Sequence, residues 1–121
     1  MSSPVGQRIN ATMLARLRDL SEPGGPDVLA ELIGMYLADT PRFIDDLRRA
    51  IHNSDPEGVR NLAHMLKGSS SNMGAQRLET ICCDLENLAR AGSLEGAAGL
   101  LDAIHREFVC VRALLSAEQT K

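Results

Sequence analysis

The sequence predicts an all-α protein: an antiparallel up-down four-helix bundle with a short additional N-terminal helix. Apolar residues recur at steps of three and four along almost the whole chain, and no segment shows the sustained alternation of a half-buried strand. Hydrophobic residues make up 44% and charged residues 24% of the 121 residues, the balance of an ordinary globular protein. Length and composition together predict a single domain over residues 1–121, with its helical core at about 27–116.

The N-terminal third predicts a short leading helix and the start of the bundle. The leading helix covers residues 10–20, and the Gly- and Pro-rich segment 21–26 ends it. Asp27 is a suitable cap for the next helix. Thr40 and Pro41 then interrupt the apolar stripe as a cap and a first helical residue would, so this part is either one kinked helix or two.

Three further helices follow. A cluster of cap and start residues at 53–56 begins the first of them, and the polar residues after Gly68 and a turn at Gly74 separate it from the second. Segment 91–93 ends the second helix, and the last one covers about 94–116. Amphipathic helices joined by such short turns can bury their apolar stripes together as an up-down bundle.

Composition argues against several functional classes. Aromatic residues make up only 2% of the chain and the net charge is −3, so nucleic acid is not an expected partner. No apolar stretch approaches the ~20 residues that cross a bilayer, and the first residues lack the features of a secretory signal, so we expect no membrane association and a cytoplasmic protein. The three cysteines lack C-x-x-C spacing, which favours reduced thiols over disulfides or zinc.

One polar helix face carries residues suited to chemistry. In a projection of about 100° per residue, His64 lies about 150° from the centre of its helix's apolar stripe, so the imidazole should face solvent. Arg60, Lys67 and Gly68 lie within one turn on or near the same face. Lys67 is one of only two lysines, and a glycine within or near the end of a helix costs up to ~1 kcal/mol relative to alanine.

This combination favours the carriage of a phosphoryl group. A neutral imidazole nitrogen can attack phosphorus while a nearby ammonium offsets charge on the phosphoryl oxygens. The missing side chain at Gly68 would let a partner protein approach closely. The chain has no phosphate-binding glycine-rich loop and no convincing carboxylate cluster for Mg²⁺, so another protein must bring both the phosphoryl group and the metal.

Residues 64–75, HMLKGSSSNMGA, closely resemble the signature of histidine phosphotransfer (HPt) domains, and the similarity in helix order extends over about residues 28–115. The resemblance implies a four-helix bundle that carries phosphoryl groups between receiver-domain aspartates in two-component signalling. Its expected partners are response-regulator receiver domains and a hybrid sensor histidine kinase. By this resemblance His64 is the phosphorylated residue, Lys67 stabilises charge, and Gly68 is the position of close approach. No cofactor is expected on this chain, and Mg²⁺ is expected in the receiver domain.

Five further residues are candidate contacts for the partner: Arg60, Met65, Ser71, Glu86 and Arg90. Arg60 and Arg90 are better explained as solvated helix surface than as direct phosphate contacts, although either could steer an acidic receiver surface. Glu86 departs from the family pattern, because several members have a glutamine there that reaches toward the histidine. The angular count puts Glu86 on the outer side of its helix. Its carboxylate could accept a hydrogen bond from the imidazole yet would repel an arriving phosphoryl group, so we expect altered partner choice or transfer rate.

Other interpretations remain open. The bundle could be a non-catalytic interaction module that uses the His64 face only for docking, or the terminal phosphotransfer domain of a larger hybrid kinase. Gly68 followed by three serines is also typical of an ordinary helix C-terminus. His52 and His105 are assigned no role. Cys82 should face the core and Cys83 should face out, and a redox function for the latter is a minor alternative.

Overall fold

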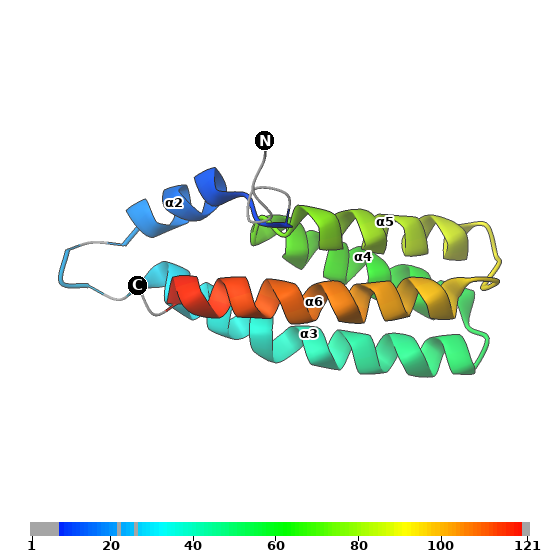
Figure 1. Ribbon diagram of the computed structural model, residues 1–121. Coiled ribbons are helices and arrows are strands. Elements are labelled where there is room, and N and C mark those ends of the chain that lie inside the picture. The colour runs from blue at the N-terminus through cyan, green and yellow to red at the C-terminus, as the bar shows by residue number, and fades with distance from the viewer. Residues whose placement is uncertain (1–7, 22, 26, 120–121) are drawn as a thin grey trace.

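The computed structural model describes residues 8–21, 23–25 and 27–119 and is entirely helical in these parts, apart from turns. The helices are α2 (Ala11–Asp19), α3 (Val28–His52), α4 (Pro56–Asn72), α5 (Gln76–Arg90) and α6 (Ala97–Gln119). The four long helices run up and down as a bundle, with α2 as the short additional helix before them (Figure 1). The predicted fold class is therefore confirmed.

The four long helices occupy the corners of a square. α3 packs against α4 and α6, and α5 packs against the same two helices (Figure 1). The α4–α5 side of the bundle consequently lies opposite the α3–α6 side. α2 lies near the end of the bundle at which α4 turns into α5 and α6 ends (Figure 1).

The apolar stripes of all four long helices meet in one core. Its largest fully buried aliphatic side chains include Leu29, Ile33, Leu47, Leu66, Leu78, Leu85, Ile104 and Leu115. Burying one such side chain is worth about 1.5–3 kcal/mol, so the core contributes the main favourable free energy of folding. None of the helices in the described residues combines the length and apolar character needed to span a membrane.

α3 is one continuous helix, which decides between the two predicted alternatives. Pro41 lies inside it and cannot donate to the carbonyl of Leu37. Thr40 does not cap a second helix; instead its hydroxyl donates to the carbonyl of Tyr36 at 2.7 Å. Pro41 is exposed, so water can reach the carbonyl that the ring leaves without a helical partner.

α4 continues past Gly68 to Asn72, so the interpretation of Gly68 as a helix C-terminus is wrong. Ser70, two residues further on, is fully buried, and its hydroxyl shares a 2.8 Å hydrogen bond with the hydroxyl of Tyr36 in α3. Tertiary packing of the last turn therefore outweighs the cost of about 1 kcal/mol for a helical glycine.

The turn between α4 and α5 depends on Gly74, as the sequence predicts. Its φ is +69°, a left-handed conformation that favours glycine. The Gly74 carbonyl accepts a 2.7 Å hydrogen bond from the backbone N–H of Asn10. A Cβ at Gly74 would lie 3.1 Å from that nitrogen, so the close approach also requires glycine.

Candidate functional site

His64 projects from the outer side of α4, with 66% of its side chain exposed. Gly68 follows one turn later and is also exposed, and a Cβ there would meet nothing within 4 Å. The imidazole therefore lies on an open helix surface that a partner protein can reach.

The carboxylate of Glu86, on the neighbouring helix α5, binds three side chains of this surface. Its Oε2 lies 3.0 Å from Nδ1 of His64 and 2.9 Å from Nη2 of Arg90. Its Oε1 lies 2.6 Å from Nζ of Lys67. Glu86 thus joins three of the residues singled out in the sequence into one cluster.

Glu86 is buried, with 4% of its side chain exposed, so its predicted outer position is wrong as to solvent exposure, whereas the expected hydrogen bond with the imidazole of His64 is present. The angular count gives the direction in which the Glu86 side chain leaves α5, but it takes no account of the neighbouring side chains that cover the carboxylate. Lys67 from α4 and Arg90 from the next turn of α5 supply that cover. Long basic side chains commonly cover neighbouring surface with their aliphatic stems while the charged group stays near water.

The ammonium of Lys67 and the carboxylate of Glu86 stabilise each other's charged forms. The hydrogen bond from Lys67, followed by that from His64, lowers the pKa of Glu86 below its ordinary value although burial opposes this. The same hydrogen bond raises the pKa of Lys67. At neutral pH the cluster therefore contains an ionised carboxylate beside a charged ammonium.

The ionised Glu86 determines which nitrogen of His64 carries the proton. An ionised carboxylate can only accept hydrogen bonds, so Nδ1 of a neutral imidazole must be the protonated nitrogen that donates to it. The lone pair then resides on Nε2, at the far side of the ring. The arrangement presents a nucleophilic nitrogen on an exposed surface, with a cation one helical turn away.

Of the other predicted contacts, Arg90 belongs to this cluster, whereas Arg60, Met65 and Ser71 lie around it. Met65 is 55% exposed next to His64, and Arg60 and Ser71 are half-buried on α4 before and after it. Arg90 is 58% exposed and joins the cluster through Glu86.

Asn87 is a member of this surface that the sequence motifs did not single out. Its side-chain oxygen accepts a hydrogen bond from Nη1 of Arg90 at 3.3 Å, while the other guanidinium nitrogen binds Glu86. Asn87 therefore helps to orient the arginine. The spacing of three residues on α5 is the signal that could have indicated this pair.

The remaining histidines and cysteines lie outside the cluster. His52 and His105 are exposed on α3 and α6. Burial raises the pKa of Cys82 to about 12, whereas Cys83 is half-exposed, so the core-facing and outward-facing predictions for this pair are confirmed. The part of the chain that the structure describes contains no group of three or more His, Cys, Asp or Glu side chains arranged to hold a metal ion.

Comparisons with known proteins give the family of this chain. The Hpt domain model matches residues 31–120. Histidine-containing phosphotransfer protein 1 of rice is 31% identical, with 86% of this chain and 75% of that protein covered. A rice protein named pseudo histidine-containing phosphotransfer protein 5 is 26% identical, with 80% and 65% covered.

A solved structure is similar over nearly its whole length. The crystal structure of histidine-containing phosphotransfer protein B from Pseudomonas aeruginosa PAO1 has 34% sequence identity and a TM-score of 0.88, with 98% of this chain and 97% of that chain covered. The chain spans about two thirds of the length of several curated plant relatives that it matches. The family model and the structural similarity together show that this chain belongs to the Hpt domain family.

Proposed function

We propose that His64 accepts a phosphoryl group from the aspartate of one response-regulator receiver domain and passes it to the aspartate of another. The observation that carries this proposal is the exposed imidazole whose Nδ1 is bound to Glu86, since this leaves Nε2 as the free nucleophile. Membership of the Hpt family supports the assignment. A hybrid sensor histidine kinase is the expected source of the phosphoryl group.

The chemical step needs little from this chain beyond the imidazole and its two charged neighbours. The Nε2 lone pair forms a bond to phosphorus as the bond from phosphorus to the aspartyl oxygen breaks, and the carboxylate leaves with the electron pair. Positive charge that develops on the ring is stabilised by Glu86 through the Nδ1–H bond. Lys67 follows His64 by about one turn of α4 and can offset charge on the phosphoryl oxygens. Transfer onward reverses these steps.

The receiver domain is expected to supply the Mg²⁺ that this reaction uses, which would polarise the phosphoryl oxygens from the partner's side. In this chain Gly68 leaves room for the partner's loops beside His64. We place the exchange in the cytoplasm, because the three cysteines are free thiols, as is typical of a reducing compartment.

The test is transfer from a receiver domain labelled on its aspartate with radioactive phosphate. The protein should acquire label that is lost in acid and kept in alkali, and His64→Gln should acquire none. His52→Gln, which changes another exposed histidine, is the matched control and should be labelled like the wild type. Undiminished label on His64→Gln would refute the proposal.

A second candidate function is docking without phosphotransfer, in which the same surface binds a receiver domain but carries no phosphoryl group. The similarity to a protein named as a pseudo phosphotransfer protein favours testing it. Under this alternative the wild type would bind receiver domains in a calorimetric titration and would stay unlabelled with every phosphorylated receiver of the source organism.

A further inference from the structure

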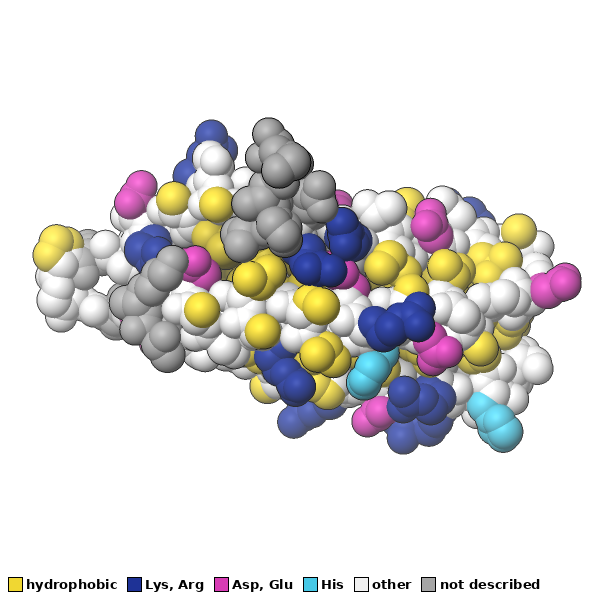
Figure 2. All heavy atoms as spheres, viewed as in Figure 1, with side chains coloured by type: hydrophobic (Ala, Val, Ile, Leu, Met, Phe, Trp, Pro, Cys, Tyr) yellow, Lys and Arg dark blue, Asp and Glu magenta, His cyan; other side chains and the backbone are white. Residues whose placement is uncertain are grey.

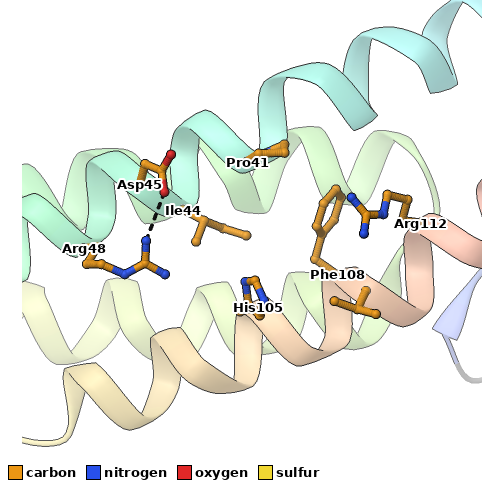
Figure 3. A pocket seen from close by; sticks show the side chains of 8 residues that line it. Pro41, Ile44, Asp45, Arg48, His105, Phe108 and Arg112 are labelled. Atoms are coloured by element: carbon orange, nitrogen blue, oxygen red, sulfur yellow. Dashed lines mark hydrogen bonds and ion pairs between the residues drawn. The ribbon is translucent and has the colours of Figure 1, made fainter.

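A groove lies between α3 and α6 (Figure 3). This side of the bundle lies opposite α4 and α5, which carry His64 and Glu86. Its floor consists of Ile44 and Phe108, which are buried in the core, and its walls include the exposed Pro41 and Val109. Val109 is 46% exposed, which is unusual for a large aliphatic side chain in this protein. The groove therefore offers an apolar surface that the bundle itself does not cover.

The rim of this groove carries more basic than acidic side chains. Arg48, His105 and Arg112 line it together with one carboxylate, Asp45 (Figure 3). Asp45 is already paired with Arg48 at 3.0 Å. The guanidinium of Arg112 instead lies over the ring of Phe108, 5.8 Å from its centre. Arg112 is thus left to meet a negatively charged group, and a ring N–H of His105 can donate a hydrogen bond to one, although the whole chain has a net charge of −3.

Figure 2 views the face on which α6 lies in front, and both dark blue and magenta side chains lie beside one of the two cyan histidines there. The groove's volume of about 200 Å³ is below the 300–1,000 Å³ typical of small-molecule sites. A groove of this volume can hold one or two apolar side chains of a peptide, but it is too small to enclose a typical small-molecule ligand.

We propose that this α3–α6 groove binds an acidic segment of a partner protein, which inserts an apolar side chain between Pro41 and Val109 and places carboxylates against Arg112 and His105. The complementarity of charge and shape selects this occupant. Because the groove faces away from His64, such a segment can stay bound while a receiver domain occupies the α4–α5 side. If the proposed function is correct, the segment would act as a tether that raises the local concentration of a relay partner.

The binding site itself is tested without phosphotransfer. The ¹⁵N-labelled full chain is titrated with a set of acidic hexapeptides with Leu, Ile, Phe or Met at the centre, up to about 1 mM, and with matched peptides in which Gln and Asn replace the acids. Amide shifts should change around Val109 and Phe108 with the acidic peptides alone. No binding by any acidic peptide, or shifts centred on α4 and α5, would overturn the proposal.

Two charge reversals on α6 separate a specific site from general attraction. Arg112→Glu should weaken peptide binding by about tenfold or more, as expected for loss of a charge-assisted contact. Arg106→Glu makes the same change on the same helix outside the groove and should change binding less than about twofold. Equal weakening by both variants would show attraction to net charge only and would overturn the proposal.

Two further measurements test for self-association through the groove and separate the groove from phosphotransfer. Sedimentation of the wild type should give a monomer. A dimer that Val109→Glu converts to monomers would assign the groove to a second copy of this chain and overturn the proposal.

Arg112→Glu should accept phosphate from a dilute isolated receiver as the wild type does. Failure of phosphotransfer in the wild type would refute the proposed function while leaving the peptide titration valid.

Discussion

At the scale of single residues, the carboxylate of Glu86 would have one favourable and two unfavourable effects on the proposed phosphotransfer. It holds Nδ1 of His64 protonated, which frees Nε2 as a nucleophile. It also occupies Lys67, which would otherwise be available to the phosphoryl oxygens, and it would add negative charge near an arriving phosphoryl group. The balance of these effects can be measured with Glu86→Gln, because glutamine keeps the hydrogen-bond acceptor for Nδ1 but removes the negative charge.

Glu86→Gln should therefore remain active and shift the equilibrium toward phosphorylated His64. A glutamine oxygen can still accept from Nδ1–H, while its neutral side chain releases Lys67 for the phosphoryl oxygens. Glu86→Ala loses the acceptor as well and should slow transfer about tenfold, the size expected for one charge-assisted hydrogen bond. The readout is the labelled fraction of the protein and receiver at equilibrium, together with the initial rate.

The control for this pair is Asp84→Asn, a charge removal at an exposed position two residues earlier on α5. It should leave both the rate and the equilibrium unchanged. Equal loss of activity in Glu86→Gln and Glu86→Ala would contradict the tautomer argument, because the two variants differ in the hydrogen-bond acceptor.

Glu86 also predicts that the stability of the folded protein depends on pH. The pKa of Glu86 is lowered in the folded protein, whereas in the unfolded chain the carboxyl has its ordinary value of 4.5. The stabilising contribution is therefore fully present above pH 4.5 and is lost as the pH falls through the lower folded pKa. The difference in free energy of unfolding between wild type and Glu86→Gln should therefore change below about pH 4.5, where the carboxyl of the unfolded chain becomes protonated.

Urea unfolding of both proteins at a series of pH values checks this expectation. The wild type should lose its advantage on acidification, so the two unfolding midpoints should move toward each other below pH 4.5. A difference that stays flat down to about pH 3 would show that the carboxyl has no depressed pKa in the folded protein.

At the scale of elements, the positions of the helices follow from the apolar pattern, whereas two of their internal details do not. Pro41 and Gly68 are local signals for a helix boundary, yet both lie inside continuous helices. In each case the residues beyond the signal belong to the common core: Ile44 follows Pro41, and Ser70 follows Gly68 and bonds to Tyr36 across the bundle. Long-range contacts decided these boundaries, and a single sequence does not reveal which contacts form.

In the candidate site, too, some features follow from the sequence and others depend on how the helices pack. The exposed position of His64 and the nearby Lys67 follow from helical geometry on one helix. The burial of Glu86 depends on how α5 packs beside α4 and on side chains from both helices that cover the carboxylate. Helical periodicity gives the direction of a Cβ, but it does not give the distance to a neighbouring helix.

At the scale of the whole molecule, the segment before α3 is joined to the bundle at widely separated points. Ile9 is 1% exposed within the core. Arg8 forms a 3.3 Å ion pair with the buried Glu107 of α6, and Arg18 forms one of 3.0 Å with Glu118 near the end of the same helix. These contacts join both ends of the leading segment to α6, so we expect α2 and the bundle to unfold as one cooperative unit.

Ile9→Ala tests this cooperativity. Removal of a buried isoleucine side chain typically costs about 2–5 kcal/mol, so the variant should be destabilised by this order. If α2 and the bundle form one unit, far-ultraviolet circular dichroism in urea should show a single transition with a lower midpoint and an unchanged slope. Leu20→Ala, which shortens a side chain that is 65% exposed, is the matched control and should unfold like the wild type.

A biphasic curve, in which a small helical signal is lost first and the main transition keeps its wild-type midpoint, would show instead that α2 unfolds independently. In that case the four long helices would be sufficient to hold His64, Lys67 and Glu86 in place, since these residues all lie on α4 and α5.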